Sequence, residues 1–285
     1  MTGSLLDRAL RLLELLAEHP AGLRLQTISG MLLIPKSAAH RLLAELAQYG
    51  YVRQAASGDY MLTSKLLTVG YAWLGGSGLG DLVQPALDAL AGVTGELVRY
   101  AVLDGERLVW LLKAQGARFG LRLDPDQGME AVLYCTATGH AWLATLDDEA
   151  AVAMVMRQGL GTLASQGPNA PTTVRALLAA LHAVRVRGYA VAIESSAVGT
   201  AAMATPVRAA GDGRVLGVLS ISGPSVRLTE ARMHMLAEQL AASARDLALL
   251  MAQEGWRGWA PERPPIGRGS FPPAEPVRRR AGAAE

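Results

Sequence analysis

Residues 34–52 have the sequence IPKSAAHRLLAELAQYGYV, and this stretch decides the fold of the first part of the chain. We consider it as a helix that advances about 100° per residue. Its apolar positions then share one narrow face, as in a helix packed on a small core: Ala39, Leu42, Leu43 and Leu46. The polar positions share the opposite face: Lys36, Ser37, His40 and Arg41. The stretch therefore predicts a short helix with a leucine-rich inner face and a cationic outer face.

The two ends of this helix are also marked in the sequence. Pro35 suits a helix start because its missing N–H would have no partner within the helix. Gly50 suits the exit, where the chain turns toward an extended segment from Tyr51 to Arg53. A charged outer face can simply be solvated. Whether it is instead a binding face has to be judged from the neighbouring elements.

Those neighbours predict a winged helix-turn-helix. An apolar helix over residues 5–16, with Ser4 as its N-cap, and a short helix over residues 26–32 precede the stretch. Residues 52–54 and 60–62 flank a Ser-Gly-Asp turn and predict a β-hairpin. In a winged helix-turn-helix, the third helix enters the DNA major groove while neighbouring groups contact phosphate.

Five separated segments resemble the IclR family of transcriptional regulators in their residues and in their spacing. They are LLDRALRLLELLAEHPAGLRLQTIS, IPKSAAHRLLAELAQYGYV, YMLTSKLLTVG, RGYAVAIESSAVG and LSISGP. The resemblance extends to about Leu250 and implies an operator-binding domain followed by an effector-binding domain. One departure lies at the helix-turn-helix bend, where the family usually has glycine and this chain has Met31-Leu32-Leu33-Ile34.

Composition fits a two-part protein of the cytoplasm. The chain has 285 residues, 51% of them hydrophobic, which suffices for more than one core. No apolar run reaches the roughly 18 residues of a membrane span, and the N-terminus lacks signal-peptide order. The single cysteine, Cys135, excludes an internal disulfide framework. We therefore expect a cytoplasmic protein without membrane contact.

Net charge alone does not reveal the DNA-binding part, because the whole chain carries only +2. The placement of the basic residues is more informative, since they lie at element edges and on the outer helix face. The candidate residues for contacting double-stranded operator DNA are Arg24, Gln26, Lys36, Ser37, His40, Arg41, Arg53 and Lys65.

The sequence predicts four regions. Residues 1–63 form the winged helix-turn-helix, and residues 64–80 a linker helix with a Gly-rich hinge around GGSGLG. Residues 81–254 form the effector-binding domain. Residues 255–285 form a disordered tail rich in Pro, Gly and Arg, which is either simply solvated or a weak phosphate contact.

The second domain is predicted to have an α/β (α+β) fold with an antiparallel sheet and helices to its side. Asp81 is expected to cap its first helix. Strands are predicted over residues 97–103, 107–113, 119–123, 189–193, 201–209 and 214–222. Helices are predicted up to residue 93 and over residues 136–146, 148–157, 173–187 and 229–253.

The sequence gives little support for catalysis. Cys135 and His140 could form a thiol and base, but on one short helix they diverge, and no residue evidently orients the imidazole. Ser195, Ser196, Ser220 and Ser222 lie in no Gly-x-Ser-x-Gly elbow. The histidines show no two-ligand spacing. We therefore predict no enzyme, no cofactor and no metal site.

The family resemblance implies a ligand site between the sheet and the loop of residues 128–144. It places Ala131, Ala137 and Thr138 on the pocket wall and identifies Ser220 and Ser222 as the family's polar pair; hydroxyls two residues apart on a strand face the same side. The complete candidate set for binding a small-molecule effector is Met129, Ala131, Leu133, Cys135, Ala137, Thr138, Ala192, Ala202, Ser220 and Ser222.

Departures from the family's glyoxylate-responsive type suggest a different effector. Ala192 and Ala202 stand where that type has an acidic residue and a cysteine, and His140 replaces the usual lysine. The cavity should therefore be roomier and more apolar, which favours an aromatic or alicyclic catabolite with one polar group. The alternative is that Thr138, Ser220 and Ser222 only satisfy loop backbone.

Two helices are expected to form contacts between chains, because residues 5–16 and 64–74 are too apolar for a lone domain. We therefore expect a homodimer or homotetramer. A competing hypothesis is an enzyme or sensor whose helix-turn-helix only binds another protein, and retention of specific DNA distinguishes the two.

Overall fold

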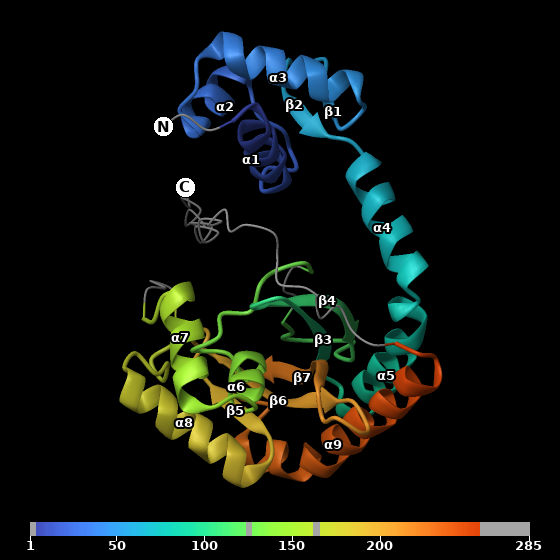
Figure 1. Ribbon diagram of the computed structural model, residues 1–285, viewed down its shortest axis with the longest axis vertical. Helices are drawn as coiled ribbons and strands as arrows, with labels where there is room; N and C mark the ends of the chain where they lie inside the picture. Colours follow the sequence, from blue (N-terminus) through green and yellow to red (C-terminus); the bar gives the residue numbers. More distant parts are fainter. Residues whose placement is uncertain (1–3, 124–126, 162–165, 257–285) are drawn as a thin grey trace. The chain divides into compact units, whose positions relative to one another are not determined.

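The computed structural model describes residues 4–123, 127–161 and 166–256 (Figure 1). The chain forms two compact units, and the boundary in the sequence lies between Ser77 and Gly78. The tail predicted for residues 255–285 lies, from residue 257 on, outside the described residues. None of the described helices combines the length and hydrophobicity needed to span a bilayer.

The first unit has the predicted order of three helices and a hairpin. The helices are α1 (Leu5–Ala17), α2 (Leu25–Leu32) and α3 (Lys36–Gln48), and the strands are β1 (Val52–Gln54) and β2 (Tyr60–Leu62). The Ser4 side chain accepts a hydrogen bond from the Asp7 backbone N–H and so caps α1. The core draws between one and three side chains from every element: Leu12, Leu15, Leu16, Ile28, Leu42, Leu43, Val52 and Tyr60.

The bend between α2 and α3 forms without glycine. Leu33 adopts the left-handed conformation, with φ +53° and ψ +41°, and its side chain is 78% exposed. The Ile34 N–H donates to the Ser29 carbonyl, and the Ser29 hydroxyl donates to the Ile34 carbonyl at 2.7 Å. These paired bonds hold a leucine in a conformation that is unfavourable for residues with a β-carbon.

The predicted Gly-rich hinge is largely helical. α4 (Lys65–Ser77) includes Gly75 and Gly76, and α5 (Leu79–Thr94) begins immediately after Gly78, whose φ of +68° marks the break. The expectation that Asp81 caps α5 was wrong, because Asp81 lies inside its first turn and Gly78 is the N-cap residue. Glycine lowers helix propensity, but Gly75 and Gly76 nevertheless lie within the last turn of α4.

The second unit is built on a five-stranded antiparallel sheet in the order β4-β3-β7-β6-β5. The strands are β3 (Leu97–Asp104), β4 (Arg107–Gln115), β5 (Ala190–Ile193), β6 (Thr200–Arg208) and β7 (Val215–Pro224). The strand predicted for residues 119–123 is absent, since that segment has no regular structure and exposes Phe119 and Leu121. An isolated apolar run without a pairing partner is insufficient for a strand.

Helices cover both faces of the sheet, rather than one side (Figure 1). α5 and α9 (Glu230–Gln253) pack on the face that carries Tyr100, whose hydroxyl donates to the Leu216 carbonyl. The opposite face packs against α6 (Ala137–Leu143) and α8 (Val174–Arg187), with α7 (Asp148–Gln158) behind them. Side chains alternate along each strand, so each strand serves two cores.

Gly139 lets α6 approach the loop before it. A β-carbon at Gly139 would lie 2.3 Å from the Leu133 carbonyl oxygen, which is backbone and cannot move aside easily. The Thr136 side chain caps the same helix by accepting from the Gly139 N–H at 3.0 Å. These contacts fix α6 over β5, β6 and β7.

Candidate nucleic-acid interface and effector site

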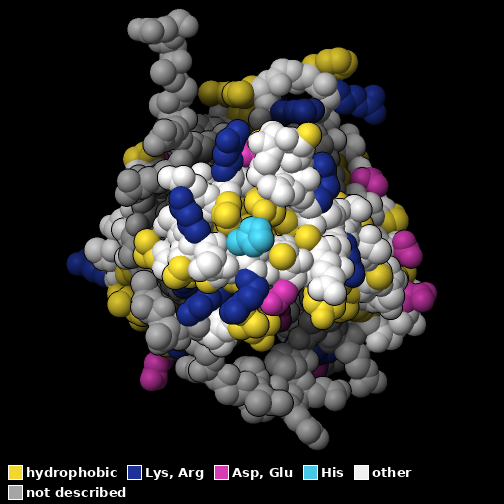
Figure 2. Space-filling model, turned by 90° about the horizontal axis from the view of Figure 1, so that it is seen from above, with side chains coloured by type: hydrophobic (Ala, Val, Ile, Leu, Met, Phe, Trp, Pro, Cys, Tyr) yellow, Lys and Arg dark blue, Asp and Glu magenta, His cyan; other side chains and the backbone are white. Residues whose placement is uncertain are grey.

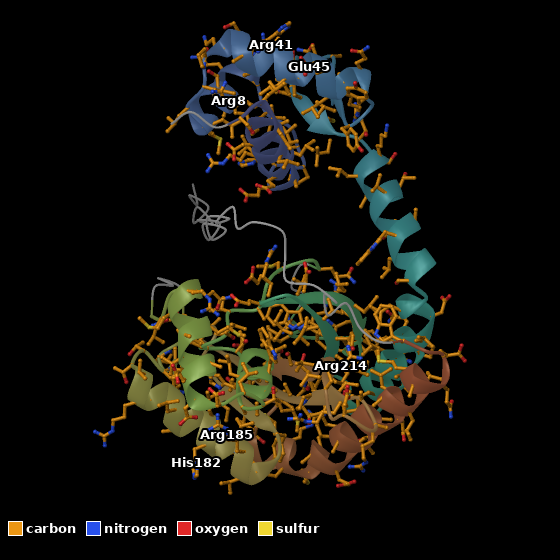
Figure 3. All side chains as sticks on the ribbon, viewed as in Figure 1. Arg8, Arg41, Glu45, His182, Arg185 and Arg214 are labelled. Carbon is orange, nitrogen blue, oxygen red and sulfur yellow. The ribbon has the colours of Figure 1, made fainter. Side chains whose placement is uncertain are left out.

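The outer face of α3 is open to solvent, as the sequence predicted. Ala39, Leu42 and Leu43 are at most 2% exposed and anchor the helix from beneath. The side chains on the opposite face are all exposed: Lys36, Ser37, His40 and Arg41. The view from above shows several dark blue Lys and Arg side chains spread around a histidine, with hydrophobic side chains between them (Figure 2). Arg41 projects from α3 in Figure 3.

Two candidate cations keep their donors available for a ligand. Within the described residues, the side chains of Arg41 and Arg53 have no hydrogen-bond or ion-pair partner, and both are exposed. Arg53 lies on β1 of the wing, next to α3 in the chain. Guanidinium groups of this kind are well suited to phosphate oxygens.

Other candidates are committed to contacts within the unit. Lys36 Nζ donates to the Gln26 side-chain oxygen at 3.4 Å and so connects α3 to α2. Arg24 lies 3.6 Å from Asp59 of the wing turn. Lys65 donates to the Tyr49 carbonyl at 2.6 Å and lies over the Tyr51 ring. Lys65 therefore holds the end of α3 against the start of α4.

The wing has one pairing that the sequence did not predict, an isolated β-bridge between Leu23 and Tyr60. The Leu23 N–H donates to the Tyr60 carbonyl at 2.9 Å, and the Tyr60 N–H donates back at 2.8 Å. This bridge attaches the segment before α2 to the hairpin, with Gly22 (φ +89°) beside it. The wing is thereby attached to the segment that leads into α2.

In the second unit, most of the predicted effector residues lie together between α6 and the sheet. Those in one buried cluster are Ala131, Leu133, Cys135, Ala137, Ala192 and, partly buried, Ala202. Thr138, Ser220 and Ser222 are buried beside it. Met129 is the outlier at 51% exposed, because its segment runs along the edge of β4, where its carbonyl accepts from the Trp110 N–H.

Cross-strand pairing places the alanines and serines in rows on the sheet. Ala192 pairs with Ala202, and Ala202 pairs with Ser222. In the next row, Ser220 pairs with Arg99 of β3. The Ser220 hydroxyl donates to the Arg99 carbonyl at 3.4 Å. This contact agrees with the alternative that Ser220 only satisfies a backbone group.

Arg99 is the functional candidate that sequence reasoning missed. Its guanidinium lies 3.9 Å from the centroid of the Trp110 ring, and one nitrogen donates to the Ser222 hydroxyl at 3.3 Å. Trp110 Nε1 in turn donates to the Thr138 hydroxyl at 3.3 Å. Burial lowers the pKa of Arg99 to about 10. An arginine among the apolar residues of this strand was the available signal.

Cys135 and His140 are poorly suited to act as a nucleophilic thiol and its base. Burial raises the pKa of the Cys135 thiol to about 12, so little reactive thiolate forms. His140 Nε2 donates to the Tyr134 carbonyl at 2.6 Å, and burial lowers the pKa of its imidazole. In the described part of the chain, no three His, Cys, Asp or Glu side chains come together in a group that could hold a metal ion.

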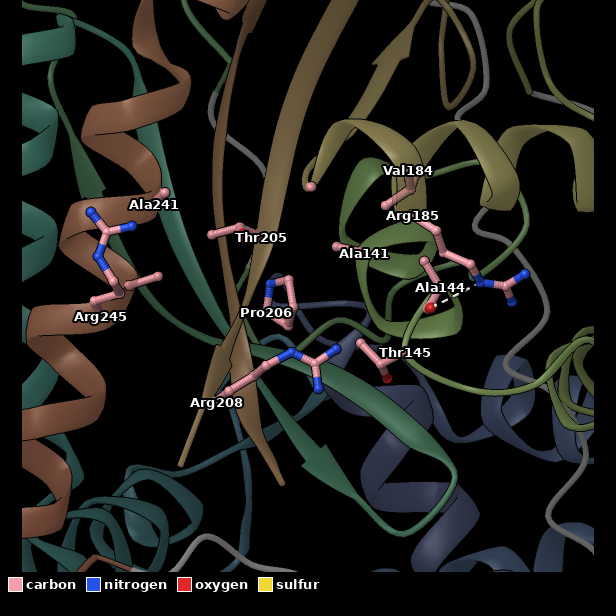
Figure 4. A pocket seen from close by; sticks show the side chains of 12 residues that line it. Ala141, Ala144, Thr145, Val184, Arg185, Thr205, Pro206, Arg208, Ala241 and Arg245 are labelled. Atoms are coloured by element: carbon pink, nitrogen blue, oxygen red, sulfur yellow. Dashed lines mark hydrogen bonds between the residues drawn. The ribbon is translucent and has the colours of Figure 1, made fainter. Parts of the chain in front are cut away.

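A separate hollow of about 440 Å³ lies between α6, α8, β6 and α9 (Figure 4). It contains none of the predicted effector residues. Its three arginines already have partners: Arg185 binds Asp148 and two carbonyls, Arg208 binds the Gly213 carbonyl, and Arg245 binds Glu238. The hollow therefore offers a ligand no arginine without a partner.

Comparisons with known proteins cover both units. The protein-family model described as "IclR helix-turn-helix domain" matches residues 5–56. A second family model, "Bacterial transcriptional regulator IclR C-terminal", matches residues 72–249. The chain is 28% identical to the Pca regulon regulatory protein of Pseudomonas putida, over 85% of this chain and 82% of that one. It is also 28% identical to the transcriptional repressor IclR of Escherichia coli K12, over 86% and 88%.

The fold is also found in solved structures. One is an IclR homolog from Microbacterium hydrocarbonoxydans in complex with 4-hydroxybenzoate, with a TM-score of 0.71 and 20% identity. The alignment covers 88% of this chain and 100% of that one. At this level of identity the likeness establishes the fold alone.

Proposed function

Since the chain belongs to the IclR family of bacterial transcriptional regulators, we propose that it binds operator DNA through α3 as a homodimer or homotetramer. It is a regulator with a DNA-binding helix-turn-helix and an effector-binding domain, not an enzyme. The observation that carries the proposal is the outer face of α3, where Lys36, Ser37, His40 and Arg41 are all exposed above a buried leucine face. Such a protein acts in the cytoplasm.

Each DNA-binding candidate has a proposed role. Arg41 and Arg53 bind phosphate, because their donors are unpaired within the described residues. Lys36 adds charge and is oriented by Gln26. Ser37 and His40 read base edges or fix register, together with Gln26. Arg24 and Lys65 support the site mainly by holding the wing and α4 in place.

Dimerisation is proposed through α1 and α4. None of the α4 side chains is buried within the chain, and Leu67, Val69 and Tyr71 are each more than half exposed. On α1, Leu5 and Leu6 are exposed to a similar degree. Apolar surface of this kind is typical of contacts between chains. Two copies would present α3 to successive major grooves about 34 Å apart.

The effector is proposed to bind between α6 and the sheet, beside Ala192, Ala202 and Ser222. The alanine side chains are small and belong to an apolar cluster, which favours a ring-bearing catabolite with a polar group. Binding would bias the spacing of the two α3 helices. A coupling of about 1–3 kcal/mol suffices to switch operator occupancy.

Selection from a random library of DNA duplexes tests this function. We expect the full-length protein to enrich inverted repeats whose half-sites lie about 10 base pairs, or a multiple of one helical turn, apart. The enriched duplex should compete far better than a scrambled duplex at matched salt. Enrichment of no sequence, with equal competition by the scrambled duplex, would instead favour the protein-interaction alternative.

A further inference from the structure

The end of α3 is bonded to the start of α4 at three successive backbone carbonyls. Lys65 Nζ donates to the Tyr49 carbonyl at 2.6 Å. The Thr63 hydroxyl donates to the Gly50 carbonyl, and the Thr63 N–H donates to the Tyr51 carbonyl at 2.9 Å. We call these five residues the α3–α4 joint. Bonds to three successive residues fix both the position and the direction of α4 relative to α3.

The charge of Lys65 suits its place in the α3–α4 joint. Tyr49 is the C-cap residue of α3, so its carbonyl lies at the negative end of the helix dipole, where carbonyls lack partners within the helix. The Lys65 ammonium also lies 4.9 Å from the centroid of the Tyr51 ring. Hydrogen bonds from a charged donor are stronger than those from a neutral donor. Lys65 therefore stabilises the end of α3 and its connection to α4 together.

The same contacts separate Lys65 from the other cations that the sequence predicted to contact DNA. Its ammonium already has a carbonyl partner and an aromatic ring. The side chains of Arg41 and Arg53, by contrast, have no hydrogen-bond or ion-pair partner among the residues that the structure describes. A phosphate contact would require Lys65 to give up a charge-assisted bond of 2.6 Å. The contacts of Lys65 therefore favour a role within the protein.

The other end of α4 is rich in backbone freedom. A β-carbon at Gly75, Gly76 or Gly80 would meet no atom within 4 Å, and Gly78 has a φ of +68° where α4 gives way to α5. Glycine has the widest choice of backbone conformations. The side chains of α4 are all at least partly exposed, so they add little restraint of their own. The α3–α4 joint is therefore the end of the linker that fixes the direction of α4.

A fixed direction of α4 relative to α3 has a consequence for operator recognition. If two copies meet through α4, as proposed above, the joint determines where each α3 lies relative to the contact between the copies. Two binding elements that are connected stiffly bind tightly only when the spacing of their sites matches the connection. A flexible connection accepts many spacings and favours none of them strongly.

We propose that Lys65 and Thr63 select the spacing between operator half-sites by holding α4 to the end of α3. Lys65 is in this respect a positioning residue and not a phosphate contact. The inference rests on the proposed function, including the contact between copies through α4, and adds how the half-site spacing is set.

Duplexes with altered spacing test the proposal. The selected duplex is compared with two duplexes in which the same half-sites are moved apart by half a helical turn, about five base pairs, or by one full turn. Fluorescence anisotropy measures the affinity of the full-length protein for each. We expect the wild type to bind the selected duplex at least about 30-fold more tightly than the duplex with the half-turn insertion.

Two variants interrupt the α3–α4 joint in different ways. Lys65→Gln removes the charged donor, whereas Thr63→Val removes the hydroxyl without a change of charge. Both should reduce the preference for the selected spacing to less than about 5-fold, chiefly by weakening the selected duplex. Lys65→Arg should keep most of the preference, because a guanidinium can donate to the same carbonyl. Arg175→Gln, at an exposed arginine on α8, makes the same charge change as Lys65→Gln and should keep all of it.

Salt dependence separates positioning from phosphate contact. For a positioning residue, Lys65→Gln leaves the slope of log K against log salt as in the wild type. A phosphate contact at Lys65 would instead make the slope shallower by about 2 in a dimer and weaken all three duplexes equally, and this result would overturn the proposal.

Two further results would overturn it. One is an unchanged spacing preference in both Lys65→Gln and Thr63→Val, and the other is a wild type that binds all three spacings alike. In either case the selected half-sites are still bound, so the regulator stands and only the role of the joint is wrong. If the wild type selects no duplex at all, the proposed function itself is wrong and this inference falls with it.

Discussion

Removing Lys36 and Arg41 together is expected to weaken binding of the selected duplex about 100-fold at 0.15 M salt. Both side chains project from the outer face of α3, and a dimer loses each of them twice. Each phosphate contact contributes about −0.9 to the slope of log K against log salt, so the double variant should also show a slope shallower by as much as about 4.

The measurement is fluorescence anisotropy across a salt series, with the wild type, Lys36→Ala, Arg41→Ala and the double variant. Arg175→Ala on α8 is the control, because it removes an exposed arginine from the second unit. Far-UV circular dichroism confirms that the exposed substitutions leave folding intact. If the double variant keeps both the affinity and the slope of the Arg175→Ala control, α3 does not contact the duplex.

Glu96→Gln is expected to lower the free energy of unfolding of the second unit by about 3–5 kcal/mol. Glu96 is 1% exposed and accepts from Arg227 at 2.6 and 2.8 Å and from Arg232 at 3.1 Å. Arg232 also donates to the Thr94 carbonyl at 2.6 Å, so the cluster connects the end of α5 to the start of α9. A neutral amide would leave two partly exposed guanidinium groups short of their buried counter-ion.

Urea unfolding followed by circular dichroism measures this loss. Glu238→Gln is the matched control, because Glu238 forms an ion pair of 2.7 Å with Arg245 but is 84% exposed at its side chain. An exposed pair of this kind contributes at most about 1 kcal/mol. Equal midpoints for the Glu96 and Glu238 variants would show that the buried cluster does not hold α9 to the sheet.

The first unit could be predicted closely because local signals agree there. The apolar period of residues 34–52, the Ser4 cap and the Ser-Gly-Asp turn each act within a few residues, and the structure has the same helices and hairpin strands. The bend at Leu33 was less predictable, because paired bonds between Ser29 and Ile34 impose a conformation that leucine alone disfavours.

The errors in the linker and in the second unit arise where tertiary context overrides local preference. Gly75 and Gly76 predicted a hinge, but both lie inside α4. Residues 119–123 have the apolar content of a strand, yet no neighbouring strand pairs with them. Arg99 was missed because its importance depends on register: only pairing shows that it shares a face with Ser220, Ser222 and Lys113.

Directed cleavage of DNA from α3 tests the central claim most directly. Burial raises the pKa of Cys135 to about 12, so an introduced surface cysteine can be labelled selectively with an iron chelate. Ser37→Cys on α3 is compared with His182→Cys, exposed on α8 of the second unit (Figure 3). The account predicts that the Ser37→Cys conjugate cuts the selected duplex within each half-site, and that the His182→Cys conjugate leaves the half-sites intact. Cleavage by the Ser37→Cys conjugate that is absent or uniform along the duplex would contradict it.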